Sequence, residues 1–208
     1  MKQKFSVLDI NIGNVGSVVN MCSQIGVEMD VVKSQNEIYD SDFLIIPGVG
    51  SFDFAMNRIN DLNILDSLNY VALKKKIPVL GICLGMQIMT KSSAEGTCTG
   101  LAWLDADVCH FNLADKLRVP HMGWNTIVSC TNNYFLPDTV NSWSFYFVHS
   151  YFVKCNDKSD ILMKTYYGKP FVSAFKKSNL FGVQFHPEKS HIYGKNLLKN
   201  IFTYYKTI

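Results

Sequence analysis

Short apolar runs alternate with amphipathic segments from the start of the chain to Cys83. Apolar runs of about four to eight residues bounded by glycine, proline or aspartate are typical of buried strands, whereas apolar residues recurring every three or four positions indicate a helix. We predict strands at Phe5–Leu8, Val27–Val32, Phe43–Ile46 and Val79–Ile82, and helices at Val15–Ile25 and 52–76. Strands that alternate with helices predict an α/β fold with a parallel sheet.

The pattern changes between Leu101 and Phe175, where short runs are rich in aromatic and β-branched residues and favour antiparallel strands. These runs are Thr126–Ser129, Phe145–Tyr151, Ile161–Tyr166 and Val172–Phe175. A further buried strand is expected at Leu180–Phe185, and the segment 193–205 places its apolar residues on one face of a final helix. We therefore predict a mixed, mostly parallel central sheet flanked by helices, with antiparallel strands added in the second half.

The composition indicates a compact protein with one core. The chain has 208 residues, 48% of them hydrophobic and 18% charged. This length and balance fit one domain, which we place at 1–208. The formal net charge is only +3 and no basic stripe is present, so nucleic acid is not expected as a partner. Asp9 interrupts the first apolar run, and no run is long enough to cross a bilayer, so we expect no membrane contact and a cytoplasmic location.

The six cysteines do not form a C-x-x-C pair, and nothing resembles a metal-ligand set. We therefore expect free thiols, no metal and no cofactor. Five of these thiols fit small buried apolar residues. Cys83 differs because of its neighbours.

Cys83 lies in the segment Gly81-Ile82-Cys83-Leu84-Gly85, between a predicted strand and a predicted helix. This G-x-C-x-G pattern is the thiol counterpart of the nucleophile elbow known for serine. Glycines allow close backbone approach, and the start of the following helix favours a thiolate. By itself the pattern fits a packed cysteine in a tight turn equally well, so a base elsewhere in the chain has to decide between the two interpretations.

A base is available in Gly182-Val183-Gln184-Phe185-His186-Pro187-Glu188. In an extended chain alternate residues share a face, so His186 and Glu188 point the same way. Pro187 biases His186 toward an extended backbone, and the carboxylate then fixes the tautomer of the imidazole. Alone, His186 fits a surface or core histidine better; together with the elbow it completes a Cys83, His186 and Glu188 triad for acyl transfer.

Beyond the triad, the chain resembles a class I, or triad-type, glutamine amidotransferase over nearly its whole length. Within that family it is most similar to the glutaminase subunits of imidazole glycerol phosphate synthases. The resemblance rests on an ordered set of motifs: Asp9 with Gly13-Asn14, Pro47-Gly48-Val49-Gly50-Ser51-Phe52, Gly81 through Gln87, Val119-Pro120-His121-Met122-Gly123-Trp124-Asn125, Tyr146-Phe147-Val148-His149-Ser150-Tyr151, and Gly182 through Ser190.

The resemblance implies roles for residues outside the triad. It places an oxyanion site at the backbone N–H groups near Val49 and Gly50 together with Leu84. It also implies four contacts to the amino-acid end of glutamine, namely Gln87, Glu95, Ser150 and Tyr151. The implied reaction is attack of Cys83 on the amide carbon of L-glutamine, release of ammonia protonated by His186, and hydrolysis of the glutamyl thioester.

Ammonia has to be protected from bulk water, which would protonate it to unreactive ammonium. The family implies a heterodimer with a (β/α)8 cyclase-type synthase subunit that receives the ammonia. His121, Met122, Trp124 and Asn125, with the aromatic stretch 143–151, contain residue types that anchor interfaces, and they fit a core equally well.

The sequence departs from the family pattern in two places. Asn11 stands where glycine is expected, and His191-Ile192-Tyr193 stands where small residues are usual. We therefore leave the ammonia acceptor open between a cyclase that makes imidazole glycerol phosphate and a synthase that builds amidino sugars for a surface polysaccharide. Two rivals are a stand-alone cysteine hydrolase acting on another amide and an inactive binding module.

Overall fold

A computed structural model of the chain describes residues 3–112, 117–130 and 143–206. Its α-helices are α1 (Val15–Ser23), α2 (Gln35–Tyr39), α3 (Phe52–Asp61), α4 (Leu65–Asn69), α5 (Leu84–Gln87) and α6 (His191–Lys206). A π-helical turn follows α4 at Tyr70–Lys74, and short 3-10 helices lie at Lys158–Asp160 and Pro187–Lys189. The large sheet has the spatial strand order β2 (Asp30–Val32), β1 (Phe5–Leu8), β3 (Phe43–Gly48), β4 (Val79–Cys83), β13 (Leu180–Val183), β12 (Lys169–Lys177), β10 (Tyr151–Cys155), β6 (Ala106–His110) and β5 (Ser92–Ser93). Strand β11 (Ile161–Tyr167) pairs with β12, and β8 (Val128–Ser129) pairs with β11.

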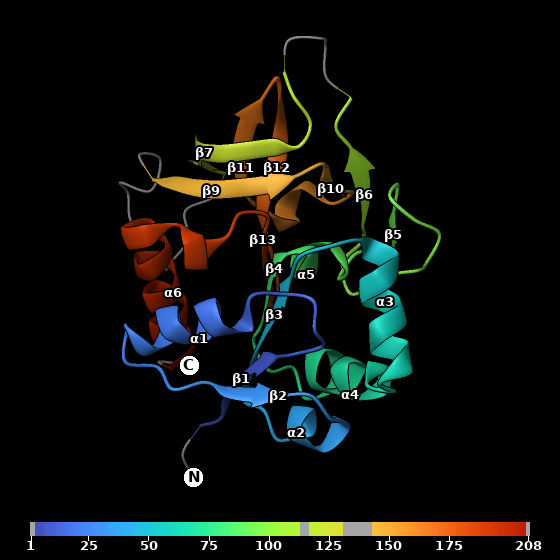
Figure 1. Cartoon of the computed structure of the whole chain (residues 1–208), viewed down its shortest axis with the longest axis vertical. Coiled ribbons are helices and arrows are strands. Elements are labelled where there is room, and N and C mark those ends of the chain that lie inside the picture. Colours follow the sequence, from blue (N-terminus) through green and yellow to red (C-terminus); the bar gives the residue numbers. More distant parts are fainter. Residues whose placement is uncertain (1–2, 113–116, 131–142, 207–208) are drawn as a thin grey trace.

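The sheet is parallel in its first half and mostly antiparallel in its second. Strands β2, β1, β3, β4 and β13 run parallel, whereas β12 is antiparallel to β13, and β10 is antiparallel to both β12 and β6. Figure 1 shows α1 and α6 on one side of the sheet and α3 and α4 on the other. This arrangement confirms the predicted α/β fold class.

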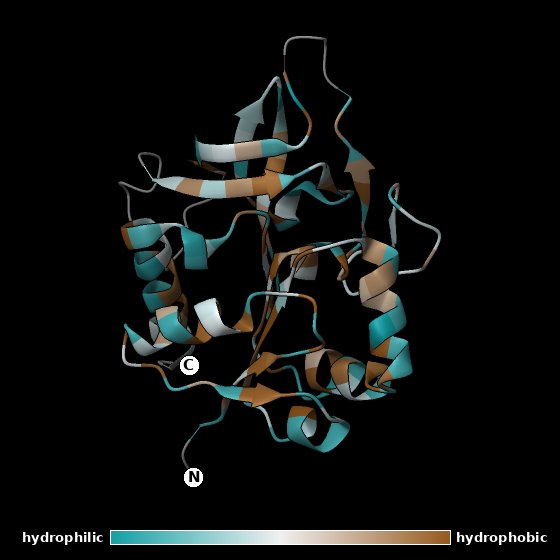
Figure 2. Cartoon of the chain, viewed as in Figure 1, coloured by the Kyte–Doolittle hydropathy of each residue, from teal (hydrophilic) through white to brown (hydrophobic). Residues whose placement is uncertain are grey.

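Each face of the sheet carries its own core. In β3, Leu44 and Ile46 pack with residues of α3 and α4, whereas Phe43 and Ile45 pack with residues of α1 and α6. Alternate strand residues point to opposite faces, so a strand covered on both sides is apolar throughout. All six residues of β3 are buried, and Figure 2 shows hydrophobic residues concentrated along the central strands.

Antiparallel β7 (His121–Thr126) and β9 (Ser144–His149) form a separate two-stranded sheet. A β-bridge between Tyr146 and His186 joins this ribbon to the segment that follows β13. The ribbon therefore lies at the end of the sheet to which the carboxyl ends of the central parallel strands point (Figure 1). In the ranges that the structure describes, no helix has the length and apolar character needed to cross a membrane.

Several boundaries differ from the predicted elements. The strand predicted at Val27–Val32 begins only at Asp30, and the run Phe145–Tyr151 is divided into β9 and β10. The helix predicted over 52–76 is interrupted after Asp61, where Asn63 takes a positive φ of 53°. A left-handed residue cannot continue a right-handed helix, so α3 ends there and α4 begins a new segment.

Candidate active site

Cys83 ends β4 and precedes α5, as the G-x-C-x-G pattern predicts. Its backbone has φ 53° and ψ −108°, a strained conformation for a residue with a side chain. Glycines permit this turn: a Cβ on Gly81 would lie 2.6 Å from the carbonyl oxygen of Gly85, and a Cβ on Gly85 would overlap the carbonyl oxygen of Ile46. The helix that follows has only four residues, so it offers its first N–H groups to the site rather than a long dipole.

The neighbouring strands place Cys83 between two loops. In the register of the parallel strands, Cys83 is level with Gly48 of β3, and Ile82 is level with Val183 of β13. The carboxyl ends of these strands therefore meet around the sulfur, which is the usual position of a site in an open α/β sheet.

His186 and Glu188 come together through a turn, not through the extended chain that the sequence predicted. Strand β13 ends at Val183, and Pro187–Lys189 form a 3-10 turn. His186 itself is extended, with φ −104° and ψ 96°, as expected of a residue before proline. The turn brings Glu188 Oε1 to 2.7 Å from His186 Nδ1.

This pair is buried, and its hydrogen bond fixes which nitrogen of the His186 ring carries the proton. The side chains of His186 and Glu188 are 1% and 4% exposed. Because the carboxylate accepts, Nδ1 carries a proton and Nε2 is the nitrogen left for chemistry. Among the described residues, Nε2 has no hydrogen-bond partner. Backbone contacts hold the ring in place: His186 N donates to Tyr146 O at 2.9 Å, and Ser190 Oγ donates to His186 O at 2.6 Å.

The electrostatics couple His186 to Cys83. Burial lowers the pKa of His186, but the nearby Cys83, together with the Glu188 carboxylate, outweighs it and raises that pKa to about 10. The structure thus brings Cys83, His186 and Glu188 together. The raised pKa favours the protonated form of the imidazole at neutral pH.

The two predicted oxyanion donors on the loop after β3 are in different situations. Val49 N donates to Ile12 O at 3.1 Å, so its N–H is committed elsewhere in this conformation. Gly50 has φ 113°, a region that favours glycine. An oxyanion role for Val49 requires that its bond to Ile12 break, whereas Leu84 is already the first residue of α5.

The four predicted substrate contacts differ in their burial and in their hydrogen-bond partners. Gln87 is buried, and its amide nitrogen donates to Tyr151 O and to Gln184 Oε1, each at 3.1 Å. Glu95 accepts from Phe52 N at 2.8 Å and so caps the start of α3 beside the Gly50 loop. Ser150, which separates β9 from β10, and Tyr151, the first residue of β10, are both half-buried.

The predicted docking residues on β7 separate into two groups. Met122 and Trp124 are 62% and 49% exposed, whereas His121 is 3% exposed. His121 therefore belongs to the interior, and Asn125 is half-buried. Trp124 stacks on His191, with ring centroids 5.5 Å apart and planes 6° from parallel.

The two departures from the family pattern both take positive φ. Asn11 has φ 62° and His191 has φ 46°. Asparagine tolerates this conformation better than other residues with a side chain, which explains how it replaces an expected glycine. His191 begins α6 and supplies the ring on which Trp124 stacks.

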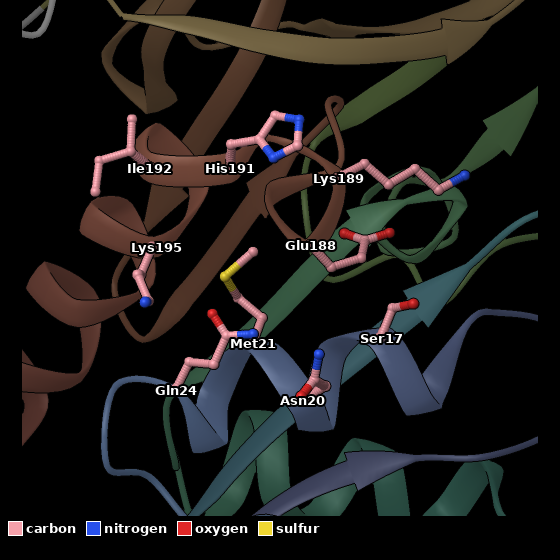
Figure 3. Close-up of a pocket in the computed structure, with 9 residues that line it drawn as sticks. All are labelled: Ser17, Asn20, Met21, Gln24, Glu188, Lys189, His191, Ile192 and Lys195. Carbon is pink, nitrogen blue, oxygen red and sulfur yellow. The ribbon is translucent and has the colours of Figure 1, made fainter.

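A cavity of about 400 Å³ adjoins the acid of the triad. Figure 3 shows residues of α1 facing the start of α6 across it. Its lining residues are Ser17, Asn20, Met21, Gln24, Glu188, Lys189, His191, Ile192 and Lys195. Neither Cys83 nor His186 lines this cavity, so Glu188 is the only member of the triad that it contacts.

Sequence reasoning missed one polar side chain at the sulfur. Gln184 is fully buried, and its amide nitrogen lies 3.6 Å from Cys83 Sγ. The signal was available, since Gln184 and His186 are alternate residues that share a face in an extended chain. The described residues contain no cluster of three or more histidine, cysteine or acidic side chains suited to a metal ion.

Comparisons with known proteins show the family to which the chain belongs. Residues 6–204 match the family described as glutamine amidotransferase class-I. The imidazole glycerol phosphate synthase subunit HisH 2 of Methanococcus maripaludis is 44% identical, over 94% of this chain and 96% of its own. The HisH subunit of Leptospira interrogans is 40% identical, over 93% of this chain and 97% of its own. The solved structure of PurLQS from Thermotoga maritima, at 15% identity, shares the fold with a TM-score of 0.75 over 98% of this chain and 99% of that one.

Proposed function

The chain belongs to the class I glutamine amidotransferase family, and from this premise we propose that it is the glutaminase subunit of an imidazole glycerol phosphate synthase in histidine biosynthesis. It hydrolyses L-glutamine to L-glutamate and ammonia. The ammonia passes to a cyclase-type subunit. The relatives that support this pathway are named as HisH subunits and match more than nine-tenths of the chain.

The observation that carries the proposal is the buried His186–Glu188 pair and its electrostatic coupling to Cys83. Cys83 Sγ attacks the side-chain amide carbon of glutamine, and a bond forms between sulfur and carbon. His186 Nε2 delivers its proton to the departing nitrogen, so the carbon–nitrogen bond breaks and ammonia leaves. A water molecule then loses a proton to His186 Nε2 and attacks the thioester, which releases glutamate and restores the thiolate.

Glu188 does not touch the substrate and acts on each step of the reaction by way of the His186 imidazole. Its 2.7 Å contact with Nδ1 keeps that nitrogen protonated and aims Nε2 at the sulfur. The negative charge that develops on the amide oxygen needs donors placed in advance. We assign these to the N–H groups of Leu84 and of the Val49–Gly50 loop, with the loop changing conformation to free Val49 from Ile12.

A partner subunit completes the function because ammonia is lost in bulk water as ammonium. We place the docking surface on the outer face of β7, where Met122 and Trp124 are exposed. Exposed aromatic and methionine side chains are the types that anchor interfaces. The docked partner is a cyclase-type subunit of (β/α)8 architecture, and this end of the sheet is also where Cys83 lies.

A substitution of the nucleophile tests the activity. We expect Cys83→Ala to abolish glutamate release in the presence of the cyclase-type subunit, while circular dichroism and partner binding stay unchanged. Cys130→Ala, which removes an exposed thiol away from the triad, is the matched control and should keep full turnover. Unchanged turnover in Cys83→Ala would refute the assignment of Cys83 as the nucleophile.

A genetic test decides the pathway. Deletion of the gene in a strain without a second copy should cause histidine auxotrophy, and the wild-type gene should restore growth where the Cys83→Ala gene does not. Growth without histidine in the deletion strain would contradict the histidine assignment. A loss of amidino sugar from the surface polysaccharide in that strain would assign the ammonia to sugar synthesis instead.

A further inference from the structure

The sulfur of Cys83 has a second polar neighbour besides His186. Gln184 follows β13 directly, and β13 is the strand beside β4. Its side chain is fully buried, and its amide Nε2 donates to Cys83 Sγ across 3.6 Å. Sulfur is a large acceptor, so this separation is within hydrogen-bonding reach.

A second glutamine sets the orientation of this amide. Gln87 Nε2 donates to Gln184 Oε1 and to Tyr151 O, each at 3.1 Å. Both partners of Gln87 Nε2 are acceptors, so the amide of Gln87 cannot be turned round without placing oxygen against oxygen. Because Gln184 Oε1 faces Gln87, the donor end of Gln184 faces the sulfur.

The Tyr151 carbonyl that anchors Gln87 is itself held by a neutral histidine pair. His149 Nδ1 donates to Tyr151 O at 2.7 Å, which leaves His149 Nε2 as an acceptor for His121 Nδ1 at 3.1 Å. Burial lowers the pKa of His121 to about 4 and that of His149 to about 3, so both rings are neutral near pH 7. Asn125 Nδ2, 3.2 Å from His121 Nε2, completes the chain of donors and acceptors.

We propose that Gln184 is a further catalytic residue, which donates a hydrogen bond to the Cys83 sulfur and favours its thiolate form, and that Gln87 is the positioning residue that aims Gln184. The proposal deepens the glutaminase function proposed above and rests on it for its role in turnover. A buried thiolate needs donors to replace water. The imidazolium of His186 supplies one, and the Gln184 amide supplies the other.

This arrangement also changes the interpretation of Gln87. The resemblance implied a contact to glutamine, but both donors of its amide are committed to protein acceptors. Only its Oε1 remains for a ligand. The main effect of Gln87 is therefore exerted on the free protein, before any substrate binds.

The test measures the reactivity of the thiol without glutamine, so that its outcome is independent of the glutaminase activity. Alkylation of Cys83 by iodoacetamide is followed by mass spectrometry from pH 5 to pH 10, with exposed Cys130 as the internal reference. The titratable groups around Cys83 are His186, with Glu188 behind it, and His149, which lies within electrostatic range of His186. They are unchanged in each variant.

Gln184→Met keeps the length of the side chain and removes the donor. Loss of a hydrogen bond to a charged group typically shifts the titration midpoint of that group by about one to two pH units. The bond from Gln184 to the sulfur is long, so we expect the lower figure. We expect the midpoint of Cys83 alkylation to move upward by about one pH unit, with about a tenfold lower rate at pH 6. Gln3→Met, the same change at an exposed position, should leave the profile unchanged.

Gln184→Asn is the milder second variant. Its amide is one methylene shorter and cannot reach both Gln87 and the sulfur, so it should shift the midpoint in the same direction. Thermal unfolding identifies a variant that has lost its fold, in which case the other carries the test. Midpoints within about 0.3 pH unit of the wild type in the folded variants would overturn the role of Gln184.

Gln87→Met tests the positioning step. If Gln87 acts through Gln184, this substitution shifts the alkylation midpoint in the wild-type background and adds almost nothing in the Gln184→Met background. If Gln87 serves only to bind glutamine, alkylation of the free protein is unchanged and only the KM for glutamine rises, which would overturn the positioning role. Loss of glutaminase activity in every protein, with the alkylation shifts intact, would refute the proposed function alone.

Discussion

Gly81→Ala tests whether close packing of β4 against α5 holds the nucleophile in place. A Cβ at position 81 would lie 2.6 Å from Gly85 O and 2.7 Å from Met86 N, and ordinary contacts begin at 3.4 Å, so the two segments must separate by about 0.8 Å. The obstructing atoms are backbone and cannot rotate away. Strand β4 is paired on both sides, with β3 and β13, so the strain cannot be relieved at a sheet edge.

The displacement acts on Cys83 because this residue joins β4 to α5. Overpacking of this kind costs about 1–3 kcal/mol of the free energy of unfolding. A shift of about 1 Å at a reacting group costs about a hundredfold in rate, so we expect kcat/KM for glutamine to fall between tenfold and a hundredfold. The sulfur should also lose its hydrogen bond from Gln184 and its alignment with His186, and its alkylation should slow.

The assays are urea unfolding, glutamate release with the partner present, and alkylation of Cys83. Gly16→Ala is the matched control, because Gly16 is an exposed residue of α1 and a Cβ there would have its nearest neighbour, Asn14 Oδ1, 3.9 Å away. That control should gain about 0.4–1 kcal/mol, since alanine restricts the unfolded chain and suits a helix. A Gly81→Ala protein with wild-type stability and turnover would refute the packing argument.

Three further predictions concern the triad acid, the buried histidines and the docking face. Glu188→Gln removes a carboxylate that raises the pKa of His186, so that pKa should fall below its value of about 10. The kcat should fall by about a hundredfold or more, and a pH–rate profile will measure both effects. The pKa of His149 is lowered by burial from 6.5 to about 3, so the unfolded state binds more protons below pH 6.5 and stability is lost as the pH falls toward 3. The wild type should therefore lose roughly 2 kcal/mol more unfolding free energy than His149→Gln when the pH falls from 7 to 5, as urea titrations at both pH values will measure. An identical loss in both proteins would contradict the assignment of His149 as a neutral ring. Trp124→Ala should weaken partner binding by about tenfold or more in calorimetric titration, with little change in the stability of the isolated chain, and unaltered affinity would place the docking surface elsewhere.

Local signals predicted the elements that build the parallel half. Apolar runs located β1, β3, β4 and β13, and the periodicity of the last segment located α6. One missed element carried a readable signal: α2 begins with a capping box in which Ser34 and Glu37 bond each other's backbone. The break after α3 had no comparable signal, because asparagine at a positive φ is decided by the packing around it.

The second half was less predictable for a physical reason. Strands β9 and β10 are separated by a single residue, yet they belong to different sheets. Their sequences are similarly apolar and aromatic, so pattern alone indicates strands without indicating partners. Pairing in antiparallel sheets depends on register and long-range packing, which a local pattern does not contain.

The sequence by itself determined which residue types could do the chemistry: a cysteine in a glycine turn, and a histidine two residues before a glutamate. It did not determine how they meet, and the extended link assumed between His186 and Glu188 is in fact a 3-10 turn. Only the tertiary structure decided that β13 pairs with β4, and this pairing brings together side chains that are 101 positions apart, as in the contact of Gln184 with Cys83. Strand propensity is a property of neighbouring residues, whereas the choice of partner strand depends on the free energy of the whole sheet and its two cores.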